Sequence, residues 1–257
     1  MDNAVPWFED KTFWLNYAPY MFNDQRWSAA PEEVDNIIKL LSLNPGDRVL
    51  DLCCGVGRHS VSFAEKGLSV TGVDLTEPFL EAAEETARDR ELSIEFIRAD
   101  MRLFERSNTF DAVVNLFTSF GYFETTEEEA GVLSHIHSSL KDGGKILIEL
   151  MGKEILSRLF LPRDWYQEEE TLVLMEREVF ENWERIKNRW ILIRGNNKTE
   201  YVFSHRLYSA FELMSLLEKA GFSQLKAYGD FDGSPYDEKA SRLIVTGSKH
   251  PNEQTTN

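Results

Sequence analysis

The sequence predicts an α/β fold in which helices cover both faces of a doubly wound, mostly parallel sheet. Short apolar runs alternate with helical patterns between residues 48 and 149, and the first run ends in a glycine-containing turn. Such alternation implies parallel strands joined by right-handed crossovers. With 257 residues, 42% of them apolar, the chain is long enough to bury a large core.

The alternating part begins with a helix that we expect to start at Pro31. Apolar residues follow it at helical spacing: Val34, Ile37, Ile38 and Leu41. We expect strands at 48–52, 69–73, 94–97, 111–115 and 143–149, and helices at 58–66, 77–90 and 127–139. Thr126 and Glu129 have the spacing of a capping box for the last of these helices.

Composition divides the chain into five segments. Residues 1–30 are aromatic and expected to be irregular, forming a lid, and residues 31–149 form the core. Residues 150–208 are predicted to be an antiparallel β insertion of about three strands, within 171–207. Residues 209–250 complete the core with a helix, capped by Ser209 and Glu212 and ended by Gly221, and a final strand pair. Residues 251–257 are expected to be a disordered tail.

The turn after the first strand is the most informative feature. Gly55 and Gly57 allow positive φ and the close approach of a ligand, and a helix begins near Arg58. Asp74 lies 17 residues beyond Gly57, at the end of the next strand, where its carboxylate can accept hydrogen bonds from both hydroxyls of a ribose. The arrangement fits an adenosyl ligand. Ser60 would partly complete a dinucleotide fingerprint, but an acid within the first strand, Asp51, argues against that alternative.

These motifs resemble the class I S-adenosylmethionine-dependent methyltransferases, whose first motif reads acidic-x-Gly-x-Gly-x-Gly. Here it reads Asp51-Leu52-Cys53-Cys54-Gly55-Val56-Gly57, with Cys53 in place of the first glycine. Residues 96–101, 110–117 and 140–149 resemble later motifs of the family in the expected order. The resemblance implies a seven-stranded Rossmann-like sheet, S-adenosylmethionine as cofactor and methyl transfer.

The carboxyl ends of the strands gather the expected cofactor site. We expect Asp74 to hold the ribose, Leu75 and Met101 to sandwich the adenine, and Asp100 to accept its exocyclic amine. Arg26 precedes the first motif much as an arginine does in glycine N-methyltransferase and similar small-molecule enzymes, and it is preferred over Arg58 as the partner of the methionine carboxylate. The full set of expected cofactor-binding residues is Tyr17, Tyr20, Arg26, Asp51, Cys53, Gly55, Gly57, Arg58, Asp74, Leu75, Asp100, Met101, Asn115 and Leu116.

Residues on the acceptor side are harder to identify. Asn115 and Tyr122, at and after the fourth strand, are the candidate catalytic residues, and Asp230, Asp232 and Tyr236 form a second candidate group. Tyr17 and Tyr20 could offer ring faces to the sulfonium. The histidines at 135, 137 and 205 are interpreted as structural. No metal-ligand spacing occurs, so no metal is expected.

Composition narrows the function class. The net charge of −16 and the lack of a basic patch disfavour nucleic acid, so a small-molecule methyl acceptor, methylated at nitrogen or oxygen, is expected. Because the N-terminus has no apolar run, we expect no signal peptide and no membrane contact. The two cysteines are adjacent, which suits a reducing compartment. A cytoplasmic location is therefore expected. Three alternatives remain: an NAD-dependent oxidoreductase, a protein or RNA methyltransferase, and a non-catalytic cofactor-binding module. Exposed strands of the insertion could also pair into a homodimer.

Overall fold

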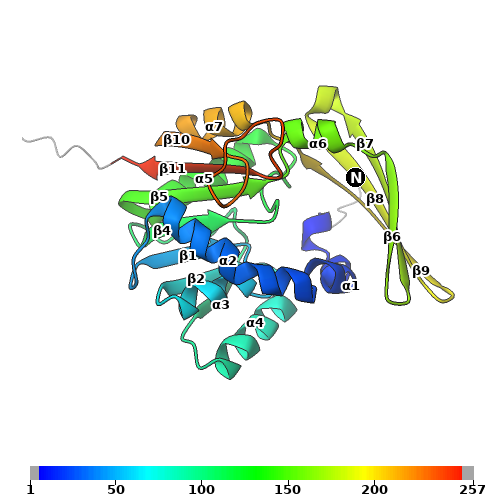
Figure 1. The fold of residues 1–257 in the computed structure, drawn as a ribbon, viewed down its shortest axis with the longest axis horizontal. Helices are drawn as coiled ribbons and strands as arrows, with labels where there is room; N and C mark the ends of the chain where they lie inside the picture. Colours follow the sequence, from blue (N-terminus) through cyan, green and yellow to red (C-terminus); the bar gives the residue numbers. More distant parts are fainter. Residues whose placement is uncertain (1–5, 251–257) are drawn as a thin grey trace, which may run out of the picture.

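The computed structural model describes residues 6–250, which form a layered core and a second, smaller sheet beside it (Figure 1). The core strands are β1 Arg48–Leu52, β2 Ser69–Asp74, β3 Glu95–Arg98, β4 Phe110–Asn115, β5 Leu140–Leu150, β10 Phe222–Tyr228 and β11 Leu243–Lys249. They lie in the order β10-β11-β5-β4-β1-β2-β3, and β11 runs antiparallel to both of its neighbours. The predicted doubly wound, mostly parallel seven-stranded sheet is therefore confirmed.

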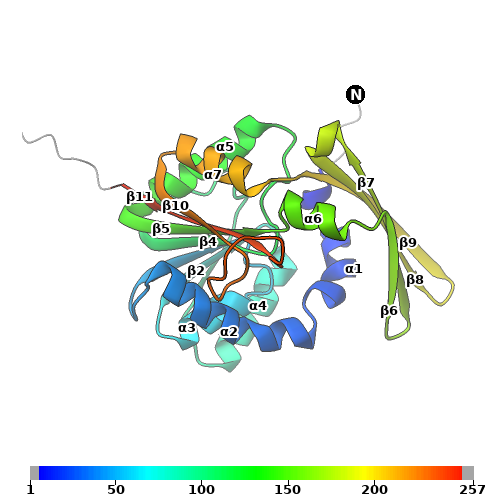
Figure 2. The ribbon, with the colours of Figure 1, turned by 45° about the horizontal axis from the view of Figure 1, so that its top comes forward.

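Helices cover both faces of this sheet (Figure 2). One face carries α2 Asp24–Leu41, α3 Arg58–Glu65 and α4 Glu77–Asp89, and the other carries α5 Thr126–Ser139 and α7 Ala210–Lys219. Alternate residues of the central strands explain the two layers, since Val49 and Val114 pack with α2, whereas Leu50 and Val113 pack with α5 and α7. The sheet is thus buried on both sides, as a parallel sheet requires.

The N-terminal segment is more regular than expected. Within the described residues it forms the short helix η1 Trp7–Glu9 and the helix α1 Lys11–Met21, so the expectation of irregular structure is wrong there. The Asp10 carboxylate accepts a hydrogen bond from the backbone N–H of Thr12 and caps α1. The next helix, α2, begins at Asp24 rather than at Pro31, because the Asn23 side chain caps it. The expected disordered tail, 251–257, lies outside the described residues.

One predicted cap is displaced by a residue. The capping box of α5 joins Thr125 and Glu128, not Thr126 and Glu129. Glu129 is instead fully buried and accepts a hydrogen bond from the Tyr208 hydroxyl. The box formed by Ser209 and Glu212 at the start of α7 is confirmed.

The insertion forms a four-stranded antiparallel sheet rather than one of about three strands. Its strands are β6 Arg163–Glu168, β7 Thr171–Phe180, β8 Arg185–Arg194 and β9 Asn197–Arg206, in sequential order. The additional strand, β6, is mostly exposed and has no apolar alternation to reveal it in the sequence. The helix α6 Lys153–Leu159 precedes this sheet, and η2 Glu181–Trp183 joins β7 to β8.

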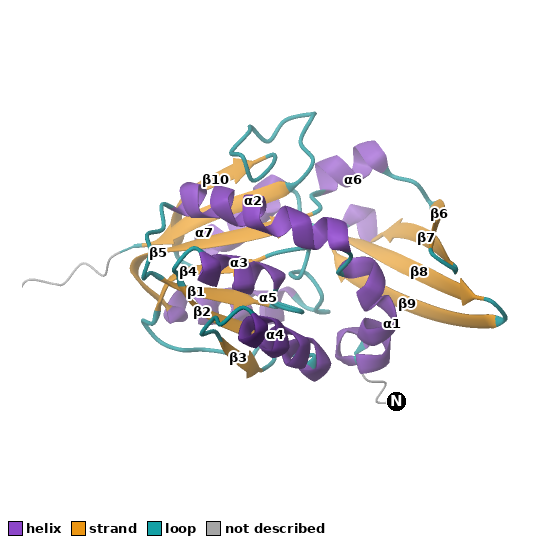
Figure 3. Ribbon diagram, turned by 60° about the horizontal axis from the view of Figure 1, so that its bottom comes forward, coloured by secondary structure: helices purple, strands orange, loops and turns teal. Residues whose placement is uncertain are grey.

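Helix α1 lies between the core and the second sheet (Figures 2 and 3). The Tyr17 ring stacks on Trp190 of β8 with centroids 4.0 Å apart, and the Phe13 ring lies 5.3 Å from Phe203 of β9. Trp7 contacts both Phe203, at 4.8 Å, and Tyr122 of the core, at 4.7 Å. Aromatic contacts from the N-terminal segment therefore connect the second sheet to the core.

A buried charge network joins the helices and strands beside the glycine turn. The Glu33 carboxylate of α2 contacts Arg58 Nη1 at 2.9 Å, His59 Nε2 at 2.8 Å and Arg242 Nη2 at 3.0 Å. Burial opposes the charge on Glu33, but the bonds from His59 and Arg58 outweigh it and lower the pKa of Glu33 to about 2. Arg242 also reaches Glu149 of β5, at 3.3 Å.

We predict that Glu33→Gln lowers the free energy of unfolding at pH 7 by about 3 kcal/mol, because it leaves buried cations without a counter-charge. Since the folded pKa of Glu33 lies below its usual value of 4.5, its stabilisation is complete above pH 4.5 and is lost as the pH falls toward 2. The difference in the free energy of unfolding between wild type and variant should therefore become smaller as the pH is lowered. Urea unfolding at several pH values would measure it, with exposed Glu32→Gln as the control; an equal loss in the two variants would contradict the prediction.

Candidate functional site

The turn between β1 and α3 has the backbone that a close ligand contact requires. Cys53, Gly55 and Gly57 all adopt left-handed conformations, with φ of 67°, 56° and 72°. Cys53 therefore takes the conformation that glycine has in the family motif. At Gly55 an added Cβ would come within 2.9 Å of the Phe22 ring, so glycine is required there in this arrangement. The space directly above the backbone of the turn is thus occupied by the Phe22 ring.

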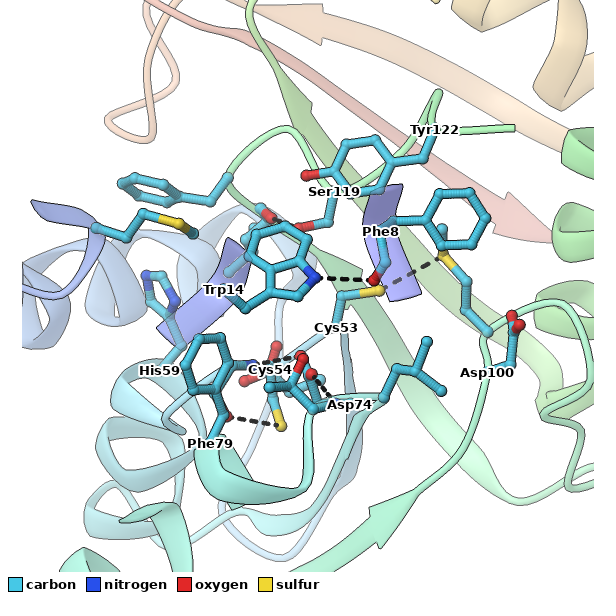
Figure 4. A pocket seen from close by; sticks show the side chains of 18 of the residues that line it. Phe8, Trp14, Cys53, Cys54, His59, Asp74, Phe79, Asp100, Ser119 and Tyr122 are labelled. Atoms are coloured by element: carbon cyan, nitrogen blue, oxygen red, sulfur yellow. Dashed lines mark hydrogen bonds between the residues drawn. The ribbon is translucent and has the colours of Figure 1, made fainter. Parts of the chain in front are cut away.

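A first cavity lies over this turn and the carboxyl ends of β1, β2 and β4 (Figure 4). Most of the predicted cofactor residues line it, together with the candidate Tyr122: Asp51, Cys53, Gly55, Arg58, Asp74, Leu75, Asp100, Met101 and Leu116. The predicted residues outside its lining are Tyr17, Tyr20, Arg26, Gly57 and Asn115. The structure adds aromatic residues that the sequence analysis did not select, notably Phe8, Phe22 and Phe79.

Asp74 presents a carboxylate whose two oxygens both accept hydrogen bonds from the backbone. Its Oδ2 accepts from the backbone N–H of Gly55 and its Oδ1 from that of Thr76, both at 2.8 Å. Burial raises the pKa of Asp74, while hydrogen bonds from the backbone of Thr76 and Gly55 and from the Thr76 side chain oppose the rise. A carboxylate has about four lone-pair positions, so Asp74 can exchange some of these bonds for bonds from the hydroxyls of a ribose.

Asp100 differs from Asp74 because the Arg102 side chain is hydrogen-bonded to both oxygens of its carboxylate. The Oδ1 of Asp100 accepts hydrogen bonds from the backbone N–H of Arg102, at 2.8 Å, and from its Nε, at 3.1 Å. The Oδ2 of Asp100 accepts from Nε, at 2.9 Å, and from Nη2, at 2.6 Å. These contacts use the acceptor capacity of the carboxylate. An amine could bind Asp100 only after the Arg102 side chain moves.

Two predicted residues at the strand ends hold the site together. The Asn115 Nδ2 donates to the carbonyl oxygen of Leu52 at 3.0 Å, which joins the ends of β4 and β1. The Asp51 carboxylate accepts from the Ser60 hydroxyl at 2.6 Å, and burial raises the pKa of Asp51 to about 6. Asn115 is outside both cavities described here, so its placement is that of a positioning residue.

Both candidate arginines lie over the ring of Phe117. The guanidinium carbons of Arg26 and Arg58 lie 4.4 and 4.3 Å from the Phe117 ring centroid. Arg58 lines the first cavity, and its Nη2 is buried without a hydrogen-bond partner in residues 6–250. Arg26 lines the second cavity instead. The geometry thus makes Arg58 the better placed cation for a carboxylate in the first cavity.

A second cavity, of about 410 Å³, lies between the core and the inner face of β7, β8 and β9. Polar residues in its wall include Arg26, Asp164, Arg177, Asn188 and His205. Its aromatic residues are Trp7, Phe13, Trp14, Tyr17, Phe117, Tyr122, Trp190 and Phe203. Tyr20 lines neither cavity; its ring packs against Tyr17 and Tyr166. Asp230, Asp232 and Tyr236 are also absent from both walls.

The two cavities share part of their walls. Trp14, Met21, Phe117 and Tyr122 line both of them. Figure 4 shows Trp14 and Tyr122 on the side of the cavity opposite the glycine turn. Phe117 and the next residue, Thr118, both have positive φ, of 62° and 55°, which is uncommon for side chains of their size. Such strain at the boundary between two cavities is typical of a functional site.

In the described part of the chain, no helix has the length and apolar character needed to cross a bilayer. Residues 6–250 contain no group of three or more histidine, cysteine or acidic side chains placed to hold a metal ion.

Comparison with known proteins agrees with this site. Residues 49–144, from β1 to β5, match the methyltransferase domain family. The chain carries a methyltransferase domain. It is 25% identical over 228 residues to the glycine/sarcosine N-methyltransferase of Aphanothece halophytica, covering 87% of this chain and 84% of that protein. It is 29% identical over 131 residues to the dTDP-3-amino-3,4,6-trideoxy-alpha-D-glucopyranose N,N-dimethyltransferase of Streptomyces venezuelae, covering 51% and 53% of the two chains.

The fold recurs in solved structures. An S-adenosylmethionine-dependent methyltransferase from Clostridium acetobutylicum superimposes with a TM-score of 0.77 at 16% identity, over 93% of this chain and 98% of that chain. At that identity the likeness concerns the fold alone. The domain match agrees with the predicted methyltransferase family, and the solved structures agree with the predicted fold. S-adenosylmethionine is the cofactor that this family implies.

The donor set of the first cavity fits this cofactor. It offers the acceptor oxygens of Asp74, the unpaired Nη2 of Arg58 and a glycine turn in which φ is positive. When bound, the cofactor supplies an electrophilic methyl group.

We predict that Asp74→Ala weakens S-adenosylmethionine binding by roughly ten- to a few-hundred-fold, since each charge-assisted bond to a ribose hydroxyl contributes about 1.5–3 kcal/mol. Isothermal titration calorimetry would measure the affinity. Asp89→Ala, on the exposed side of α4, is a matched control that should bind as wild type does. Unchanged affinity in a folded Asp74→Ala protein would remove Asp74 from the site.

Proposed function

We propose that this chain transfers a methyl group from S-adenosylmethionine in the first cavity to nitrogen or oxygen of a small molecule in the second. The shared wall of the two cavities carries this proposal, because a methyl group can pass from one to the other only where they adjoin. A cavity of about 410 Å³ is within the roughly 300–1,000 Å³ usual for small-molecule sites.

Positioning supplies most of the catalysis in this proposal. Methyl transfer is an in-line displacement, and holding the two reactants in line can contribute about 7–11 kcal/mol to lowering the barrier. Phe117, Tyr122 and Trp14 form the boundary at which the reactants meet, and their apolar rings exclude water from it. Burial raises the pKa of Tyr122, so its phenol stays protonated and is available as a hydrogen-bond donor.

The acidic composition supports a small acceptor over RNA. A net charge of −16 repels a phosphate backbone, and the second cavity is lined by side chains that suit a compact, partly apolar molecule. The relatives whose names state a small substrate point in the same direction. A cytoplasmic location and a homodimer through β6 or β9, the edge strands of the second sheet, are further proposals.

The proposal is tested by a screen followed by a cavity-filling variant. Release of S-adenosylhomocysteine from wild-type protein would be measured with a panel of amines, amino acids, phenols and nucleotide sugars. S-adenosylmethionine should bind more tightly than NAD in calorimetry. Tighter binding of NAD would contradict the assignment of the first cavity.

We predict that Ile186→Trp reduces methylation of the acceptor found in the screen by at least about tenfold, because the larger side chain fills the second cavity. Ile186 is buried in that cavity wall. The S-adenosylmethionine affinity should stay within about twofold of wild type, since Ile186 is outside the first cavity. The control is Val202→Trp, at a position of β9 that is 51% exposed. Full turnover by a folded Ile186→Trp protein would place the acceptor elsewhere.

A further inference from the structure

Two polar atoms in the wall of the second cavity have no partner in residues 6–250. His205 Nδ1 and Trp190 Nε1 are buried and make no hydrogen bond there. Buried polar groups in folded proteins nearly always have a partner. Unpaired atoms in two side chains that line one cavity, on neighbouring strands, therefore indicate a polar ligand.

The strand register places these residues on one face of the second sheet. His205 pairs with Ile186, and Phe203 pairs with Asn188. Because side chains alternate along a strand, Ile186, Asn188 and Trp190 of β8 share the face that His205 and Phe203 of β9 also occupy. This face carries the acceptor cavity.

His205 lies at the end of that cavity nearest to the cofactor. Its ring centroid is 6.4 Å from that of Tyr122, and Tyr122 lines both cavities. A group that hydrogen-bonds to His205 is therefore close to the boundary that the methyl group must cross. Arg26 and Arg177 line the same cavity, but the charged residue that lowers the pKa of His205 is Arg185 of β8.

The surroundings of His205 keep its imidazole neutral. Burial, reinforced by the positive charge of Arg185, lowers the pKa of His205 to about 4. The rings that contact it are uncharged: Tyr122 of the core loop, whose phenol stays protonated, and Phe203 of the same strand, so Arg185 of β8 is the charged group that acts on it. A neutral imidazole has one bare nitrogen that accepts a hydrogen bond.

We propose, on the basis of the proposed function, that His205 accepts a hydrogen bond from the nucleophilic O–H or N–H of an uncharged acceptor with a planar apolar body. During transfer the lone pair of that oxygen or nitrogen forms the bond to the methyl carbon. The carbon–sulfur bond breaks and its electron pair stays on sulfur, giving S-adenosylhomocysteine. The proton of the acceptor passes to the bare ring nitrogen of His205 and then to solvent.

The planar body is inferred from the rings around His205. Trp7, Phe13, Trp190 and Phe203 contact one another and line the cavity, so they offer flat apolar surfaces. A phenol-type or arylamine-type acceptor combines such a body with a donor group that is uncharged at pH 7. The neutral histidine also disfavours an alkylammonium ion, which offers no lone pair.

The test uses phenol and aniline as probes, with anisole and N,N-dimethylaniline as matched molecules without the donor. Binding to protein saturated with S-adenosylhomocysteine would be followed by NMR of ¹⁵N-labelled histidine side chains, assigned with the His205→Gln variant. We expect the ¹⁵N spectrum to show a neutral His205 ring at pH 7. The resonance of its unprotonated nitrogen should shift when phenol or aniline is added, but not when anisole or N,N-dimethylaniline is added. The two donor probes distinguish oxygen from nitrogen acceptors.

Variants separate this role from a structural one. His205→Phe should weaken binding of the donor probes by about tenfold and leave that of anisole within about twofold, because only the hydrogen bond is lost. His205→Gln keeps an acceptor oxygen and should recover part of the binding but not the turnover. His135→Gln, at a half-buried position of α5 outside both cavities, is the control and should match wild type.

Several results would overturn the proposal while leaving the methyltransferase assignment intact. These are a His205 ring that is charged at pH 7, equal binding of phenol and anisole, lack of binding by both donor probes, or turnover by His205→Phe equal to wild type. Failure of the proposed function would instead appear as a lack of S-adenosylmethionine binding or of methyl transfer to any acceptor in the screen.

Discussion

The Glu33 carboxylate is the charge on which the arrangement of the site depends. It holds Arg58 of α3 and Arg242, which precedes β11, and the guanidinium groups of both arginines lie over the Phe117 ring. Glu149 accepts a hydrogen bond from the Phe117 backbone N–H at 2.5 Å, and Arg242 contacts Glu149. Residues from α2, α3, β5 and the loop before β11 therefore hold one strained position. Because Phe117 lines both cavities, the network also fixes the boundary between them.

Much of this site follows from the sequence, and the reason is local geometry. The positions of Asp74, Leu75, Asp100 and Met101 depend only on where β2 and β3 end, and those ends were predicted from short-range patterns. The glycine turn is equally local. Arg102, by contrast, occupies Asp100 through four hydrogen bonds, and nothing in the motif indicates which cation will pair with a given acid.

The errors arise where long-range contacts decide between equivalent local patterns. Thr125 and Glu128 have the same spacing as Thr126 and Glu129, and the choice between them depends on Tyr208, far along the chain, which binds the buried Glu129. The face that His205 occupies also depends on long-range contacts, since its strand alone does not show which side is covered. That face is set by the pairing of β9 with β8 and by the aromatic residues of α1 and η1 that cover it.

The N-terminal aromatic segment contributes to both cavities, which connects them physically. The first cavity encloses about 110 Å³, below the roughly 300–1,000 Å³ of most small-molecule sites, and the Phe22 ring lies over Gly55 within it. Cofactor binding there requires Phe22 to move. Phe22 follows α1 directly, and α1 supplies Trp14 and Met21 to both walls and Tyr17 to the second. A shift of α1 that opens the first cavity therefore also reshapes the acceptor cavity, so this segment couples the cofactor and acceptor sites rather than only anchoring the second sheet.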